Sequence, residues 1–129
     1  MNKSNLNISN IENYLFTLFD NVVSNNTFIG TLPDTIDSSW TDMVLIDLAF
    51  VNDLYAYGRG IVNVFLYAKP IGNGIKNVKT LFEMESKLND VINGCDGTNM
   101  MIAKTDIDAD YDDLVKWHFN VVRLNLTII

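Results

Sequence analysis

The sequence predicts a single α+β domain, with a mainly antiparallel sheet, a long hairpin and two helices packed on one face of the sheet. The hairpin is predicted because two strand-like segments, residues 42–51 and 61–69, flank a short stretch rich in turn-forming residues. The helices are predicted because two other segments repeat apolar residues at three- and four-residue steps. A length of 129 residues with 48% hydrophobic content suits one core, so residues 1–129 are expected to form one domain.

The first helix is expected to run from about residue 9 to about residue 24. Ser9 fits the N-cap position, Glu12 follows three residues later and Ile8 precedes it, which together predict a capping box with an apolar residue just outside the helix. The helix is expected to bury one apolar stripe, formed by Ile11, Leu15, Leu18, Phe19 and Val22. A short extended piece and then a polar surface loop are expected between this helix and the hairpin.

The two strands of the hairpin differ in their pattern. Residues 43–51 are apolar on both sides apart from Asp47, which is typical of a strand covered on both faces. The second strand alternates, so one of its faces is expected to carry Val62, Val64, Leu66 and Ala68. Between the strands, residues 57–60 are expected to form a flexible corner, because glycines adopt the positive φ that turns require.

The second helix is expected at residues 75–93, with Gly94 as its terminator. Its buried stripe is expected to contain Ile75, Val78, Phe82, Leu88 and Ile92. Beyond the helix, the pattern predicts a short strand at residues 100–103, a charged connection at 105–113 and a long terminal strand at 115–129.

The terminal strand changes its apolar side. Trp117, Phe119 and Val121 lie on one face, whereas the other face carries Val122, Leu124, Leu126 and Ile128. Because residues two apart share a face of a strand, this change predicts a β-bulge or bend near Val121 and Val122, or a strand that leaves its own sheet. Leu124 and Leu126 are therefore expected at a contact with a neighbouring subunit.

The composition restricts the possible partners. A net charge of −7 argues against a protein that wraps nucleic acid, because phosphate binding depends on clustered lysines and arginines. An acidic wall would instead let DNA slide past without adhering. The longest uncharged apolar run is shorter than the ~20 residues of a membrane span, and the first ten residues lack the apolar core of a signal peptide. We therefore expect synthesis in the cytosol and no membrane partner, and the single cysteine, Cys95, fits a reducing compartment.

The strongest candidate for a metal site is the acidic run of Asp106, Asp108, Asp110, Asp112 and Asp113. It begins like a calcium loop, but Tyr111 replaces the glycine of the sharp turn and Trp117 replaces the closing glutamate. A solvated acidic connection is favoured over metal binding or acid–base chemistry. His118 and Cys95 are an unusual pair of ligands for a zinc site. The sequence thus predicts no catalytic residue, metal or cofactor, and no enzyme.

Tyr57 and Arg59 are candidates for a protein interface, because tyrosine and arginine are enriched at interface anchors. An ordinary solvent-exposed turn explains them equally well. Asp108 and Asp110 of the acidic run are further candidate contact residues.

The order of elements resembles that of phage tail terminator or tail completion proteins, and related neck proteins that join head to tail share much of this plan. The resemblance covers residues 8–129. It is carried by the first helix, the hairpin that ends at residue 69, the helix at 77–92 and the strand at 117–128, without an invariant motif.

The resemblance implies a structural virion subunit without catalytic residues. Such a subunit forms a homo-oligomeric ring, typically a hexamer, which caps the tail tube, stops its polymerisation and joins it to the head connector while DNA passes without specific binding. The implied location is the virion tail or neck, with host cytoplasm during assembly. The alternatives are another neck or head-tail connector protein, a small non-viral adaptor that binds a protein, and an enzyme built on the acidic run.

Overall fold

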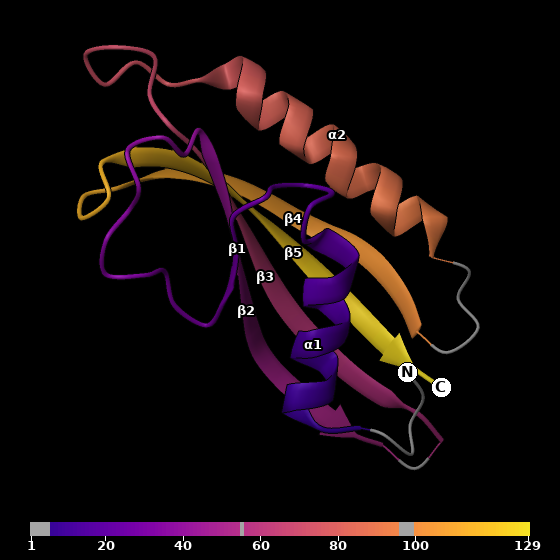
Figure 1. Cartoon of the computed structure of the whole chain (residues 1–129). Coiled ribbons are helices and arrows are strands. Elements are labelled where there is room, and N and C mark those ends of the chain that lie inside the picture. Colours follow the sequence, from indigo (N-terminus) through magenta and orange to yellow (C-terminus); the bar gives the residue numbers. More distant parts are fainter. Residues whose placement is uncertain (1–5, 55, 96–99) are drawn as a thin grey trace.

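The computed structural model describes residues 6–54, 56–95 and 100–129, which form two helices and one five-stranded sheet (Figure 1). In chain order the elements are α1 (Ile8–Phe19), β1 (Thr27–Ile29), β2 (Asp42–Asp53), β3 (Gly58–Ala68), α2 (Val78–Gly94), β4 (Met100–Asp112) and β5 (Trp117–Ile128). The strand order is β1-β2-β3-β5-β4. β1 and β2 are parallel, and the other neighbouring pairs are antiparallel. The predicted α+β class with a mainly antiparallel sheet is confirmed.

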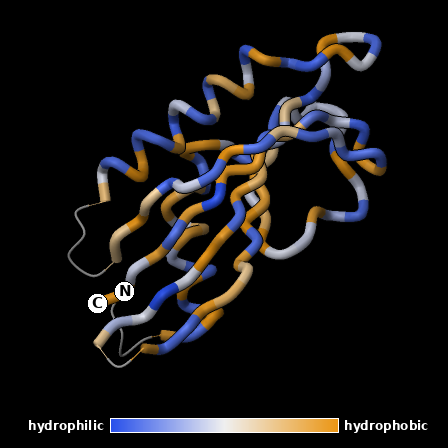
Figure 2. The backbone as a smooth tube through the Cα atoms, turned by 180° about the vertical axis from the view of Figure 1, so that it is seen from behind, coloured by the Kyte–Doolittle hydropathy of each residue, from blue (hydrophilic) through white to orange (hydrophobic). Residues whose placement is uncertain are grey.

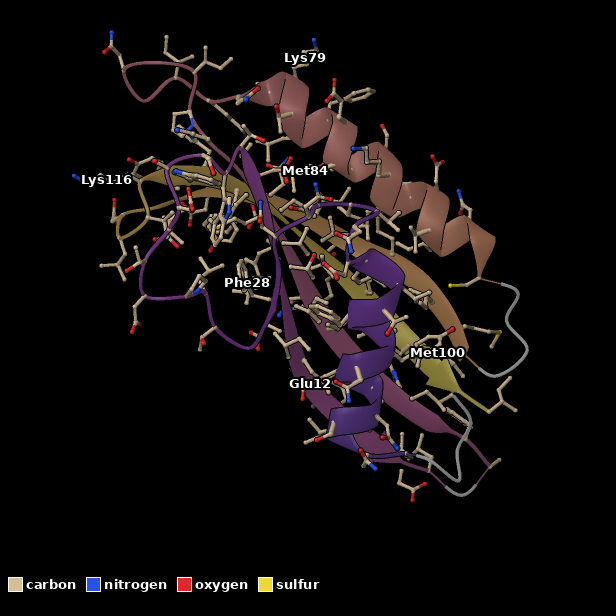
Figure 3. All side chains as sticks on the ribbon, in the orientation of Figure 1. Glu12, Phe28, Lys79, Met84, Met100 and Lys116 are labelled. Atoms are coloured by element: carbon tan, nitrogen blue, oxygen red, sulfur yellow. The ribbon has the colours of Figure 1, made fainter. Side chains whose placement is uncertain are left out.

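Both helices lie on one side of the sheet, which we call the helix face (Figure 1). The main core lies between the helices and the sheet. Strand β3 contributes the four residues that were predicted to share one of its faces, Val62, Val64, Leu66 and Ala68. Met84 points from α2 into this core (Figure 3). The opposite side, the open face, carries Asn63, Phe65 and Tyr67 of β3. Hydrophilic and hydrophobic residues alternate along the strands in Figure 2, as expected for a sheet whose two faces differ.

The predicted start of the first helix was wrong. Asn7, not Ser9, is the N-cap of α1, and its side-chain oxygen accepts a hydrogen bond from the Asn10 backbone N–H at 2.8 Å. The helix also ends at Phe19, earlier than predicted, because the backbone of Asp20 is already extended, with φ of −65° and ψ of 133°. The predicted stripe is confirmed for Ile11, Leu15 and Phe19, which are buried, whereas Val22 lies beyond the helix and is exposed.

The predicted buried stripe of the second helix was wrong for Ile75, Val78 and Phe82, whereas Leu88 is buried as predicted and Ile92 packs partly buried against the core. α2 begins at Val78 after the N-cap Asn77, and its buried residues are Leu81, Met84 and Leu88. Val78 and Phe82 are 63% and 67% exposed. The sequence contains two neighbouring apolar stripes, and the contact with β3 selects the one that the pattern did not favour.

The predicted corner at residues 57–60 was also wrong, because β3 already begins at Gly58 and Arg59 lies inside the strand. Gly58 and Gly60 serve close packing instead of a turn. A Cβ atom on Gly58 would stand 2.9 Å from a methyl carbon of Leu6, and one on Gly60 would stand 3.3 Å from the carbonyl oxygen of Phe50.

The acidic run is a strand and not a connection. Residues 105–112 belong to β4, which pairs with β5 along its whole length and has a bulge between Lys104 and Asp106. Aspartate is unfavourable in strands, so the local composition hid the alternation of carboxylates with Ile107, Ala109 and Tyr111.

The terminal strand does not bend. β5 pairs with β3 in one unbroken register from His118 to Ile128, so the prediction of a bulge near Val121 and Val122 was wrong. Leu124 and Leu126 are fully buried on the helix face, which makes them core residues and not an exposed subunit contact.

The apolar side of β5 changes because the two ends of this strand are covered by different segments of the chain, on opposite faces of the sheet. Near Ile128 the helices cover the helix face. Near Trp117 the segment between β1 and β2 covers the open face, where a second core of Met43, Tyr67 and Trp117 packs against Leu32, Ile36 and Trp40. A straight strand can therefore bury first one side and then the other.

Candidate functional site

The candidate residues that remain accessible lie in two regions of the open face. The first is the hairpin-end patch, which we define as Phe50, Arg59, Ile61 and Met101. Arg59 is exposed and pairs across the sheet with Asn52 and Thr127, and Met101 lies beyond Thr127 on the same face. Phe50 and Met101 are exposed apolar side chains. This patch places one cation on the same face as three apolar side chains, a combination found at many interface anchors.

Tyr57 lies beside this patch in the short link between β2 and β3. Its side chain is exposed, and its carbonyl oxygen accepts a hydrogen bond from the Leu54 N–H at 2.9 Å. Tyr57 thus presents an exposed aromatic ring two residues before Arg59 in the chain.

The second region is the acidic row, which we define as Asp106, Asp108, Asp110 and Asp112 of β4. Their positions two residues apart place all four carboxylates on the open face. Arg123, Val121 and Phe119 of β5 lie opposite the first three. Arg59 and the acidic row occupy different ends of the same face, so the structure does not bring these candidate residues together.

Two carboxylates of the acidic row bind backbone groups of their own strand. Asp108 accepts a hydrogen bond from the N–H of Ala109 at 2.8 Å, and Asp110 accepts one from the N–H of Tyr111 at 2.7 Å. Alternate N–H groups of a strand point to the same side. Because these two N–H groups donate to side chains, we assign them to the outer edge of β4.

Asp112 at the end of the row organises the β4–β5 turn. One of its oxygens accepts hydrogen bonds from the N–H groups of Leu114 at 2.9 Å and Val115 at 3.1 Å. The other accepts a hydrogen bond from the Tyr67 hydroxyl at 3.1 Å. Burial raises the pKa of Tyr67 well above its ordinary value of 10.0, and the negative charge of Asp112 adds to this rise.

The geometry of the acidic row does not favour a metal ion. Side chains on one face of a strand stand about 7 Å apart in a line, whereas a metal site needs ligands that converge. Within residues 6–54, 56–95 and 100–129, no group of three histidine, cysteine or acidic side chains is placed to hold a metal ion. His118 packs against the Tyr111 ring near the β4–β5 turn, where β4 ends. Cys95 is the C-cap of α2 and precedes the start of β4 in the chain.

Hollows lie beside several of these elements. A polar hollow of about 360 Å³ is lined by residues 21–26, 39–42 and Lys87. A groove of about 570 Å³ lies beside the Tyr67–Asp112 pair, and the strongly exposed Leu114 is on its rim. A further hollow of about 240 Å³ is lined by Asp106, Asp108, Asn63, Val121 and Arg123 and thus lies directly against the acidic row.

Sequence reasoning missed the outer edge of β4 and its exposed apolar residues, Ile107 and Tyr111. The signal was present, because residues 106–112 alternate strictly between aspartate and other side chains, which is the period of a strand. The arrangement offers recognition by backbone groups, charge and apolar contacts.

No helix in the described ranges is both long and apolar enough to cross a membrane. A scan against protein-family models and a search of curated proteins found no match to this chain.

Proposed function

We propose that this chain is a structural virion subunit, a phage tail terminator or tail completion protein. In this role it forms a ring, of six subunits in the typical case, on the end of the tail tube. One side of the ring matches the tube, and the other side denies further addition and presents a surface to the head connector. The action is mechanical and needs no catalytic residue.

The observation that carries this proposal is the arrangement of the elements. The chain forms a helix, a short strand, a long hairpin, a second helix and another long hairpin, in this order. The five strands make one sheet, and both helices lie on the same face of it. The resemblance to the tail terminator and neck proteins rests on four of these elements, which are α1, the β2–β3 hairpin, α2 and the terminal strand β5. The net charge of −7 also supports a location beside DNA that must move without adhering.

The surface best suited to contact between ring subunits is the hairpin-end patch. Arg59 can form charge-assisted hydrogen bonds with a neighbour, while the exposed side chains of Phe50 and Met101 supply apolar area on the same face. Leu124 and Leu126 take no part, because they belong to the core.

The proposal is tested by light scattering and negative-stain microscopy of the pure protein, alone and mixed with tail tubes. We expect rings or tube caps. Arg59→Glu should reduce them at least about tenfold, which corresponds to a loss of about 1.4 kcal/mol at the contact. Lys79→Glu is the matched control, because Lys79 is exposed on the outer side of α2 (Figure 3) and the charge change is identical.

A protein that stays monomeric at high concentration and binds neither tubes nor connector would contradict the proposal. The adaptor alternative would then be favoured. Equal losses in the two variants would remove Arg59 from the contact.

A further inference from the structure

The outer edge of β4 is an open edge of the sheet. β4 stands last in the strand order, and within the described residues it has a neighbouring strand on one side only, β5. It is 13 residues long, whereas β1 at the other edge has three. A long edge strand offers a row of backbone donors and acceptors to any extended segment that fits beside it.

The two faces of this edge strand carry different exposed side chains. On the open face stand the carboxylates of the acidic row, with the hollow of about 240 Å³ beside Asp106 and Asp108. On the helix face, Ile107 is 54% exposed and Tyr111 is also exposed. A strand that pairs with β4 would therefore meet negative charge on one face and apolar surface on the other.

A second copy of this chain does not match that pattern. If β4 paired with β4 in an antiparallel ladder, the two acidic rows would lie side by side on one face, where like charges repel. No two lysines or arginines stand two positions apart in the sequence, so no segment of the chain can present alternating cations. The short β1 could form only a brief ladder with β4.

The carboxylates also hinder the pairing of an uncharged strand with this edge. Asp108 and Asp110 occupy the outward N–H groups of Ala109 and Tyr111, so an uncharged strand must compete with these hydrogen bonds. A cation beside each carboxylate gives it a better partner, since hydrogen bonds between two charged groups are the stronger ones. The released N–H groups can then donate to carbonyl oxygens of the incoming strand.

We propose that the outer edge of β4 binds an extended segment of a different protein that carries lysine or arginine at alternate positions and apolar residues between them. The cations lie along the acidic row, and the apolar residues cover Ile107 and Tyr111. Arg123 bounds the hollow on its far side, where its Nε donates to Asn63 at 3.3 Å. This partner is specified by charge complementarity and does not depend on the formation of a ring.

The probe for this surface is a synthetic peptide of about ten residues that alternates lysine with valine or threonine. Two control peptides have the same side chains: one has its lysines grouped together, and the other has N-methyl groups on the backbone nitrogens that would pair. We expect the alternating peptide to bind at least about tenfold more tightly than either control, because only it has both the charge spacing and the backbone donors. Hydrogen exchange should slow at residues 107–111.

The matched variants are Asp108→Asn with Asp110→Asn, and Glu83→Gln with Asp90→Asn on the exposed surface of α2. Both remove two charges, and asparagine keeps an oxygen that can accept the edge N–H bonds. We expect at least about a fivefold loss of binding only in the first pair. Equal binding of all three peptides would overturn the proposal in favour of unspecific attraction.

A wild-type protein that ignores the peptides would also overturn it. If the Asp108→Asn, Asp110→Asn variant then formed dimers, the role of the acidic row would be to prevent β4 of one copy from pairing with β4 of another. The Arg59→Glu variant should bind the alternating peptide normally, so failure of the ring and failure of this surface can be told apart.

Discussion

Asp112 is the residue on which the β4–β5 turn depends. Its carboxylate accepts hydrogen bonds from two backbone N–H groups of the turn and from the Tyr67 hydroxyl. We expect Asp112→Ala to lower the free energy of unfolding by about 2–3 kcal/mol, because three donors lose a charged partner. Denaturant titration measures this loss. Asp113→Ala, at the exposed neighbouring position, should change it by less than about 0.5 kcal/mol. Similar values for both variants would contradict this role.

Tyr67 should make stability sensitive to alkaline pH. Its pKa in the folded state is raised by burial and by Asp112, so folding favours the protonated hydroxyl. The stability from this group is therefore fully present below the ordinary pKa of 10.0 and is lost as the pH rises towards the folded pKa.

Between about pH 10 and pH 11, we expect the wild type to lose about 1 kcal/mol more unfolding free energy than Tyr67→Phe. Tyr57→Phe, which changes an exposed tyrosine, is the control and should follow the wild type. Denaturant titrations at several pH values give the comparison. Parallel curves for the wild type and Tyr67→Phe would show that Tyr67 is not the source.

At the scale of elements, the start of α1 offers a direct choice between two caps. The structure gives this role to Asn7, whose side chain binds the Asn10 N–H, whereas the sequence pattern predicted Ser9. We expect Asn7→Ala to lower the free energy of unfolding by about 1 kcal/mol, the usual effect of losing an N-cap. Ser9→Ala lies within the helix and should be neutral or slightly stabilising. The reverse order of the two midpoints in urea would restore Ser9 as the cap.

The spacing of apolar residues predicted most of the helices and strands. It failed where a helix has two apolar stripes, either of which could face the sheet. Val62 to Ala68 alternated clearly, and the predicted face of β3 is the buried one. In α2, Val78 with Phe82 and Leu81 with Met84 each form an apolar stripe, and only the contact with the sheet distinguishes them. A single sequence does not contain that contact.

The accessible candidate sites were predicted as residues but not as surfaces. Arg59 was singled out correctly as exposed, yet its apolar neighbours Phe50 and Met101 come from other strands and were not foreseen. Asp108 and Asp110 were noticed for their charge, while the strand beneath them was missed because aspartate disfavours strands. Long-range pairing with β5 overrides that local preference.

At the scale of the whole molecule, the sheet is covered on opposite faces at its two ends. The helices protect the helix face, and the segment between β1 and β2 protects the open face near the β4–β5 turn. Two exposed parts of the open face are the hairpin-end patch and the acidic row of β4, which lie at different ends of it. These two surfaces are separate and differ in chemistry, since one has a cation beside apolar residues and the other has a row of anions, so each is suited to a different partner.

The position of β5 inside the sheet also governs how the chain can fold. β5 is the last strand along the chain, yet it joins β3 to β4. While a ribosome is still making residues 117–128, β3 has one unpaired edge and β4 has no neighbour at all. Open edges next to apolar residues such as Val64 and Leu66 favour aggregation. The nascent chain thus stays prone to aggregation until β5 emerges, and insertion of β5 between β3 and β4 then joins the two parts of the sheet in one step.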